Sequence, residues 1–221
     1  MEKILIVSPH PDDAELAMGG FIAKSTAAEN EVLIVELTDG EPTPFGSKEI
    51  RNTEARQAAD ILSARKINLG MPNRRLACTI SNCKKLAEVI RQYRPDMMFW
   101  PMKDDFHPDH IAANKIAKTA RFYAKLTRCK LRGEPIWVEK CFGYFSPHRC
   151  LHDKANFIVD VTDFWETKRD AILSYQSQLK NVGANGIDLL EKVEVVNRYF
   201  GLSIGRRFAE PFVAYQPIEL F

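Results

Sequence analysis

Short apolar runs alternate along this chain with longer segments in which apolar residues recur at helical spacing. Buried strands are expected at residues 3–8, 31–38, 66–69, 96–100, 138–145 and 156–161. Helices are expected at residues 12–29, 48–63, 79–93, 108–123, 163–178 and 188–200. Because strands and helices alternate, the pattern indicates βαβ units and an α/β fold with a mostly parallel sheet.

Segments rich in Gly, Pro and Asn separate some of these elements. Residues 39–47 and 181–186 are the clearest, and both are expected to be loops. With 221 residues the chain is long enough for one well-buried core, and no internal repeat divides it. We therefore expect a single domain over residues 1–221.

A histidine with neighbouring carboxylates follows two of the predicted strands. Residues 10–13 (His-Pro-Asp-Asp) come directly after the first strand, and residues 107–110 (His-Pro-Asp-His) follow the strand at 96–100. Ligands of open α/β sheets bind at the carboxyl ends of the strands. Two such clusters can converge there on one metal ion, and the chemistry that this favours is metal-assisted hydrolysis.

Catalytic zinc commonly takes three protein ligands and keeps a position for water. His10, Asp13 and His110 supply two imidazoles and one carboxylate. Asp12 is then left beside the metal, where its carboxylate can take a proton from the bound water. The same ligands also suit non-haem Fe(II), so Zn²⁺ is the first choice for hydrolysis and Fe²⁺ the alternative.

The second cluster contains further polar groups. His107 lies about one helical turn before His110, where it can donate to a developing oxyanion or protonate a leaving amine. Asp109 can hold the His107 ring in one tautomer. Each motif alone also fits a plain loop whose aspartates favour the start of a helix. The metal site is preferred because both motifs follow strands of one sheet.

Composition limits the possible partners and the compartment. The formal net charge is +2 with Lys and Arg scattered, which favours neither nucleic acid nor an anionic membrane. No apolar run approaches the roughly 18–20 residues of a membrane span, and no signal-peptide core is present, so the cytoplasm is expected. The five cysteines include no Cys-x-x-Cys pair and are expected to be reduced. His148 and His152 are expected at the surface.

These motifs resemble a known family. Residues 10–15 (His-Pro-Asp-Asp-Ala-Glu), followed by Met18-Gly19-Gly20, are similar to the opening motif of the LmbE-like, or PIG-L, deacetylases. Residues 107–110 resemble their second metal motif, and residues 51–55 (Arg-Asn-Thr-Glu-Ala) resemble an Arg-x-x-Glu-Ala helix start. Softer stretches at 157–165, 175–178 and 207–212 are similar to the bacillithiol-biosynthesis branch, so the resemblance covers nearly the whole chain.

The resemblance implies a Rossmann-like three-layer fold and hydrolysis of the N-acetyl group of a GlcNAc-containing small molecule. In this branch the substrate is a GlcNAc–malate conjugate, and relatives are often trimers or hexamers. His10, Asp13 and His110 match the family's metal ligands, and Asp12 matches its general base. The resemblance also makes His107 the oxyanion stabiliser or acid, with Asp109 orienting it.

Arg51 falls where the family has a substrate-binding arginine, although a surface helix charge is the alternative. The chain also departs from the family pattern. The loop at 39–46 differs from the Ser- and Asn-rich loop of bacillithiol enzymes, which leaves the aglycone open. Asp105 stands where some relatives carry a mobile aromatic residue, and it is expected either to change polarity near the metal or to face water.

The favoured hypothesis is a metal-dependent N-deacetylase that takes a small acetylated amino-sugar conjugate as its partner. One alternative is a metal-dependent amidase or esterase on a non-sugar substrate. Another is a non-catalytic sugar- or nucleotide-binding module, but no G-x-G-x-x-G motif follows the first strand.

Overall fold

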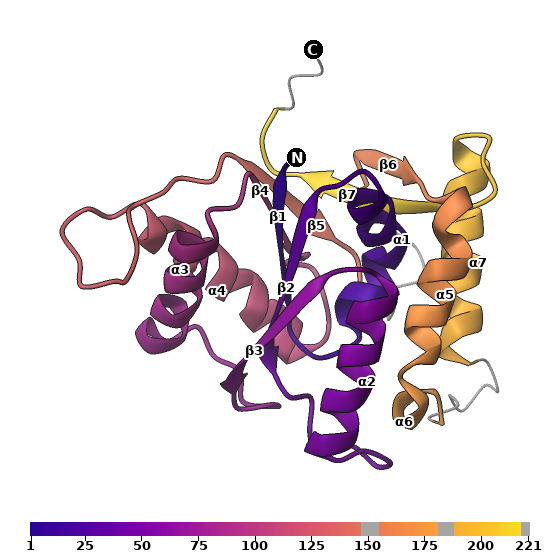
Figure 1. Cartoon of the computed structure of the whole chain (residues 1–221), viewed down its shortest axis with the longest axis horizontal. Coiled ribbons are helices and arrows are strands. Elements are labelled where there is room, and N and C mark those ends of the chain that lie inside the picture. The colour runs from indigo at the N-terminus through magenta and orange to yellow at the C-terminus, as the bar shows by residue number, and fades with distance from the viewer. Residues whose placement is uncertain (147–154, 181–187, 218–221) are drawn as a thin grey trace.

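The computed structural model describes residues 1–146, 155–180 and 188–217, which form one seven-stranded sheet with helices on both faces (Figure 1). The strands are β1 (Lys3–Ser8), β2 (Glu31–Thr38), β3 (Arg65–Met71), β4 (Met97–Pro101), β5 (Lys140–Tyr144), β6 (Phe157–Asp160) and β7 (Ala209–Ala214). The helices are α1 (Asp13–Ala27), α2 (Lys48–Ile61), α3 (Ile80–Tyr93), α4 (Pro108–Ala124), α5 (Trp165–Leu173), α6 (Gln176–Leu179) and α7 (Leu189–Ser203).

The strand order is β3-β2-β1-β4-β5-β7-β6. The pairs from β3 to β5 are parallel, and β7 is antiparallel to both β5 and β6. The α/β class and the mostly parallel sheet expected from the sequence are therefore confirmed. The strand that the sequence pattern did not predict is β7, whose residues Glu210 and Pro211 interrupt any apolar run.

Alternate residues of the central strands face opposite layers of helices, because successive side chains of a strand point to opposite faces. Leu5 and Val7 of β1 belong to the apolar cluster that contains α3 and α4. Ile4 and Ile6 belong to the cluster that contains α1 and α2. A smaller cluster joins α1 to α5 and α7. The three-layer arrangement follows from this two-sided burial.

The expected helix at 163–178 is divided in the structure. A 3₁₀ turn (Thr162–Phe164) comes first, then α5, then α6. Tyr175 lies at the break with a ψ of 55°, and its hydroxyl contacts Lys66 Nζ at 2.8 Å and Glu15 Oε1 at 3.0 Å. These contacts tie the break to a buried ion cluster, which a reading of helical periodicity cannot detect.

Helix α1 is kinked at Met18, whose φ of −145° is not helical. The kink frees the N–H groups of Gly20 and Phe21, and both donate to the buried carboxylate of Glu210 at 2.9 and 2.7 Å. A Cβ at Gly20 would lie 2.7 Å from the Val161 side chain, so only glycine fits this crossing. Lys168 Nζ contacts Glu210 at 2.6 Å and Asn197 at 2.8 Å. We call Lys168, Asn197 and Glu210 the Lys168 cluster.

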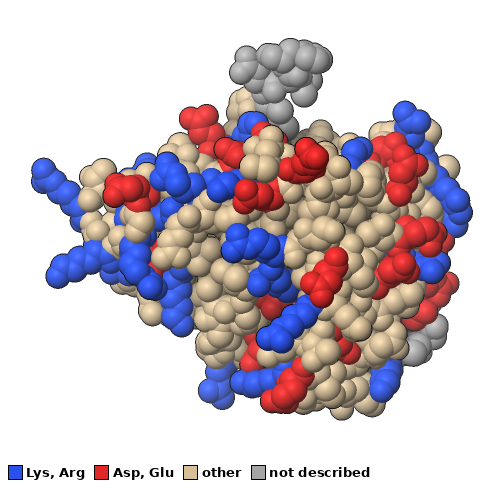
Figure 2. All heavy atoms as spheres, viewed as in Figure 1, with Lys and Arg blue, Asp and Glu red and all other residues tan. Residues whose placement is uncertain are grey.

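On the surface, Lys and Arg side chains are interspersed with Asp and Glu over the face shown in Figure 2. None of the helices in the described ranges has both the length and the apolar character that crossing a bilayer requires. His148, His152 and the expected loop at 181–186 lie outside the described residues.

Candidate metal centre

The candidate site lies where the strand order of the sheet reverses. The chain proceeds from β1 to β2 and β3 on one side, and β4 and β5 lie on the other side of β1. The loops that follow β1 and β4 therefore leave the sheet side by side, which is the usual ligand position in such folds. Residues 9–12 form the first loop, and the second leads into α4 at Pro108.

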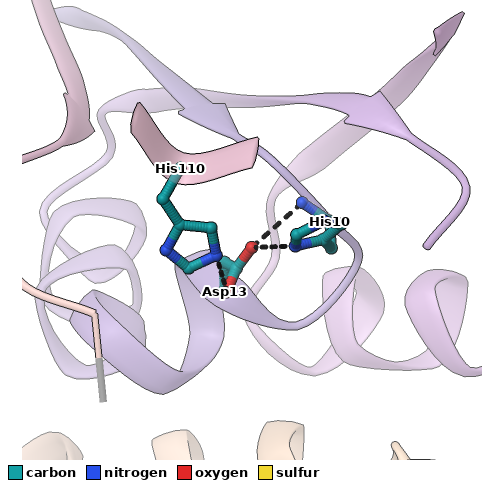
Figure 3. A group of neighbouring side chains, drawn as sticks. All are labelled: His10, Asp13 and His110. Atoms are coloured by element: carbon teal, nitrogen blue, oxygen red, sulfur yellow. Dashed lines mark hydrogen bonds and ion pairs between the residues drawn. The ribbon is translucent and has the colours of Figure 1, made fainter. Parts of the chain in front are cut away.

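The structure brings His10, Asp13 and His110 together. Asp13 lies between the two rings: its Oδ2 is 3.0 Å from His10 Nδ1 and its Oδ1 is 3.3 Å from His110 Nε2 (Figure 3). One donor atom from each residue lies within 4.8 Å of the others. Asp13 and His110 are buried, and His10 is largely covered. Two distant segments thus present a compact donor set to one point.

A carboxylate stands behind each imidazole. His10 Nε2 is 3.1 Å from Asp109 Oδ2, and His110 Nδ1 is 2.8 Å from Asp105 Oδ2. A carboxylate on one ring nitrogen holds the proton there, so the neutral ring keeps its lone pair on the other nitrogen. In both rings that other nitrogen is the one nearest Asp13. The pairing therefore orients both histidines as ligands for the same ion.

Asp109 is itself held by the segment that follows β3. The N–H of Arg74 donates to its Oδ2 at 2.8 Å, and the N–H of Leu76 donates to its Oδ1 at 3.2 Å. The expectation that the Asp109 carboxylate holds the His107 ring is not what these contacts show, because the carboxylate contacts His10. His107 Nδ1 instead accepts the backbone N–H of Asp109 at 3.2 Å.

For Asp105 the sequence left two roles open, and the structure places its carboxylate against a ligand of the metal centre. Its side chain is 3% exposed and does not face water. Besides the contact with His110, its Oδ1 accepts the His107 N–H at 2.9 Å. A carboxylate two residues before the His-Pro-Asp-His motif was the available signal, but spacing alone does not show which ring it contacts.

Opposite charges hold the imidazoles and carboxylates of the donor set together. Burial lowers the pKa of His10, but the hydrogen bonds to Asp109 and Asp13 outweigh it and raise the pKa to about 9. Burial likewise lowers the pKa of His110, but the Asp13 charge and the Asp105 contact raise it to about 10. Burial raises the pKa of Asp13, yet the charge of His110 and the contact with His10 bring it well below its usual range. The cluster thus attracts positive charge.

The donor set fits a divalent transition metal. Two imidazoles and one carboxylate are ligands that catalytic zinc takes while a position stays open for water, and Fe(II) uses the same types. The nitrogens that bind a metal must be deprotonated, so a cation here replaces protons that the carboxylates otherwise hold on the rings. His10, Asp13 and His110 are the residues that would hold the ion.

Asp12 lies at the N-cap of α1 in an unusual backbone conformation. Its φ is 108°, in the left-handed region that non-glycine residues seldom adopt. Burial raises the pKa of Asp12 to about 7, although the Arg51 charge opposes that rise. Asp12 lines the same cavity as His10 and Asp13. The conformation turns a carboxylate toward the cavity beside the donor set.

Arg51 is buried and is not a surface charge of α2. Its Nη1 lies 3.3 Å from Asp12 Oδ2, and Nη2 donates to the Pro11 carbonyl. The guanidinium also lies 5.5 Å from the centre of the Tyr175 ring. Arg51 therefore fixes the 10–13 loop through its contacts with Pro11 and Asp12, and it also lines the cavity.

His107 caps the start of α4 and is half-buried. Burial, and then the charges of His110 and His10, lower the pKa of His107, so that its ring is neutral at pH 7. Its ring centre lies 4.9 Å from that of His10. Because Nδ1 accepts the Asp109 N–H, the proton of the neutral ring lies on Nε2.

A cavity of about 360 Å³ opens over these residues, a size that suits a small molecule. Its walls come from α1, the 39–47 loop, α2, the segment after β3, and α7. Besides the residues already described, it is lined by Leu16, Gly40, Pro42, Thr43, Asn73, Arg74, Gln178, Leu189 and Lys192. The expected loop at 39–47 thus faces the pocket, and Arg74 and Lys192 add positive charge that the motifs did not indicate.

The fold and the donor set define a class: α/β proteins with a His–Asp–His centre at the point where the strand order reverses. Residues 5–121 match the family model described as PIG-L, GlcNAc-PI de-N-acetylase. The chain belongs to the PIG-L family of de-N-acetylases, so the family expected from the motifs is confirmed.

The individual relatives include a deacetylase, a conserved protein of no stated activity, and a hydratase. The chain is 29% identical to diacetylchitobiose deacetylase of Thermococcus kodakarensis, over 95% of this chain and 82% of that protein. A conserved protein of Thermus thermophilus is similar in structure, with a TM-score of 0.91, 37% identity, and coverage of 100% of this chain and 98% of that one. The chain is also 28% identical to 4-oxalmesaconate hydratase of Pseudomonas putida, over 77% of this chain and 72% of that protein.

Proposed function

We propose that this protein is a zinc-dependent N-deacetylase that removes the acetyl group from an N-acetylglucosaminyl conjugate. The observation that carries the proposal is the arrangement around one cavity of three metal-binding side chains and a further carboxylate, Asp12. Hydrolysis of an amide needs an activated water, a charge that stabilises the oxyanion, and a proton for the leaving nitrogen. This chain has a group for each.

A bound zinc ion supplies Lewis acidity, which makes a water more acidic and polarises the acetyl carbonyl. Asp12 acts as the general base. Its Oδ2 is engaged by Arg51, so Oδ1 is the oxygen that receives the proton of the attacking water. When the C–N bond breaks, the same oxygen returns that proton to the amine nitrogen. The products are acetate and a free amino sugar.

His107 stabilises the oxyanion that develops on the acetyl oxygen. The proton of its neutral ring lies on Nε2, because Nδ1 accepts the backbone N–H of Asp109. A neutral donor fits this role, because it can hold an oxyanion without first taking a proton from the water.

Acetate release from an N-acetylglucosaminyl conjugate tests the proposal. Asp12→Asn keeps the size and the left-handed tendency of the residue, and it should lower kcat by roughly a hundredfold or more. Zinc content and the unfolding temperature should stay close to wild type. Full activity in Asp12→Asn would overturn the role of Asp12. Consumption of 4-oxalmesaconate without acetate release would favour the hydratase chemistry of the Pseudomonas relative.

Within this activity we propose a conjugate with a carboxylate-bearing aglycone, of the GlcNAc–malate kind. Arg74 and Lys192 line the cavity, and neither forms an ion pair with a described carboxylate. The guanidinium of Arg74 donates to the Pro42 carbonyl at 2.8 Å, which positions it over the 39–47 loop. A ligand carboxylate would supply the missing negative charge.

A substrate comparison tests the aglycone. GlcNAc–malate should be a better substrate than neutral diacetylchitobiose, and Lys192→Met should raise KM for the malate conjugate while leaving KM for the neutral sugar unchanged. Equal kcat/KM values for both substrates in the wild type would contradict a carboxylate subsite and leave the deacetylase activity intact.

A further inference from the structure

Two cysteines lie in contact beside the segment that holds Asp109. Cys78 is exposed and Cys83 is buried, and their sulfur atoms are 3.5 Å apart. The Cys78 sulfur is also 3.6 Å from Thr119 Oγ1 of α4. Among the other described cysteines, Cys129 and Cys141 make their sulfur contacts with an arginine or with backbone carbonyls.

Local structure explains why the two sulfurs meet. Thr79 is the N-cap of α3, so Cys78 occupies the position just before the cap and Cys83 the fourth position of the helix. Side chains at these two positions commonly contact each other at a helix start. The backbone N–H of Cys83 donates to the Thr79 carbonyl at 3.0 Å, which fixes Cys83 on the helix. Cys78 is the more movable partner because it lies outside the helix.

The chain before Cys78 leads directly to the metal centre. Two residues upstream, the Leu76 N–H contacts Asp109, and four residues upstream the Arg74 N–H does so too. Asp109 in turn contacts His10 Nε2. The carbonyl of the intervening Ala77 accepts from Asn82 of α3 at 2.9 Å. Residues 74–77 therefore form a short covalent connection between Cys78 and the backbone N–H groups that hold Asp109.

We propose that Cys78 and Cys83 are a redox modification site, whose disulfide loosens the metal centre through residues 74–77. The bond requires a sulfur–sulfur distance of about 2.05 Å, so the sulfurs must approach by about 1.5 Å. The inference rests on the metal centre of the proposed function, but not on its substrate.

The reaction needs a small-molecule disulfide as the oxidant. The exposed Cys78 thiolate attacks one sulfur of the oxidant, and a mixed disulfide forms as the first small thiolate leaves. Burial raises the pKa of Cys83 to about 12, so Cys83 acts second. It loses its proton to water, attacks the Cys78 sulfur and expels the second small thiolate. The protein loses two hydrogen atoms, and the oxidant becomes two thiols.

Oxidised glutathione, applied to the full-length zinc protein and followed by peptide mass mapping, tests the bond. We expect a peptide that links Cys78 to Cys83, and its disappearance after treatment with a phosphine reductant. A Cys129→Ser control should form the same link. A mixed disulfide that persists at Cys78 while the Cys83 thiol remains free would overturn the proposal.

The zinc dissociation constant, measured by competition with a chromogenic chelator, tests the coupling without any substrate. Oxidation should raise the zinc dissociation constant about tenfold, because it would disturb Asp109, which holds the ligand His10 in place. The Cys83→Ala variant, which cannot form the bond, should show no such rise. An unchanged constant in the fully linked protein would overturn the regulatory role. Absence of acetate release in the reduced protein would instead refute the deacetylase proposal.

Discussion

Two buried clusters of charged side chains differ in where their positive charge comes from. In the Lys168 cluster, the ammonium of Lys168 is 2.6 Å from Glu210, and both side chains are fully buried. The remaining Glu210 contacts are backbone N–H groups of α1. In the metal centre, Asp13 and Asp109 contact His10, and Asp13 and Asp105 contact His110.

The difference distinguishes a structural cluster from a functional one. A buried carboxylate needs a compensating cation, because an unpaired buried charge is strongly destabilising. The Lys168 cluster contains its own cation, so it joins α1, α5 and β7 without help. In the metal centre, the cations that pair with the carboxylates among the described residues are imidazoles, whose protons a metal can replace. Perturbing zinc should therefore affect one cluster and leave the other intact.

Removal of zinc should have the largest effect. Dialysis against a chelator should reduce acetate release to background, and added zinc should restore it, because in the proposed mechanism the ion would supply the acidity of the attacking water. The intact Lys168 cluster predicts that the metal-free protein keeps its secondary structure by circular dichroism. Undiminished turnover in protein shown by elemental analysis to lack metal would contradict the proposed role of the ion.

Breaking the Lys168 cluster should lower the stability of the protein and leave zinc binding unchanged. Glu210→Gln leaves the buried ammonium without its carboxylate, and it should lower the free energy of unfolding by about 3–5 kcal/mol. Chemical denaturation measures this change. Zinc affinity should be unchanged. The double variant Lys168→Met/Glu210→Gln should recover part of the stability, because it removes the unpaired charge; no recovery would contradict an ion-pair origin.

Removing the carboxylates behind the imidazoles should weaken metal binding more moderately. Asp105→Asn and Asp109→Asn should each raise the zinc dissociation constant by about 10–100-fold, because the rings lose the partners that fix their tautomers. Asp60→Asn, at an exposed position of α2, is the matched control. Metal competition assays measure the constants. A variant with wild-type affinity would show that its carboxylate does not orient a ligand.

Proton release should be the smallest signal. Because the pKa values of His10 and His110 are raised to about 9 and 10, both rings are protonated at pH 7.5 in the metal-free protein. Zinc binding should then release about two protons, measured by calorimetry in buffers of different ionisation enthalpy. Release of no protons would contradict this protonation state.

The same raised pKa values set the sign of a stability effect. A pKa raised by folding contributes stability that is complete below about pH 6.5. This contribution should be lost as the pH rises through 9 and 10. The free energy of unfolding of the metal-free protein should therefore fall toward alkaline pH, and it should fall more than that of the zinc form.

Local features of the site could be predicted from the sequence, and non-local ones could not. The turn from His10 to Asp13 and the start of α4 follow directly from short motifs after apolar runs. The parallel order of the strands then places both motifs at one edge. By contrast, the contact between Asp109 and residues 74–76 joins separate loops, and Glu210 reaches Gly20 across 190 positions. Neither the spacing of motifs nor the periodicity of apolar residues predicts contacts between such distant positions.

The same limit applies to the elements. Strands with continuous apolar runs were predicted within a few residues, because both of their faces are buried. The strand β7 was missed because Glu210, which serves the kink in α1, occupies an inward position that an apolar residue would normally hold. The division of the helix at 163–178 has a similar cause, since Tyr175 leaves the helix to reach Lys66.

The left-handed backbone of Asp12 has a consequence for how this protein tolerates change. Such a conformation disfavours most side chains by about 1–2 kcal/mol and disfavours glycine least. A chain optimised for stability alone would therefore place glycine at position 12 and give up its carboxylate. Screens that select folded variants for heat resistance are thus expected to favour glycine at this position. Such variants should fold better and no longer catalyse the reaction.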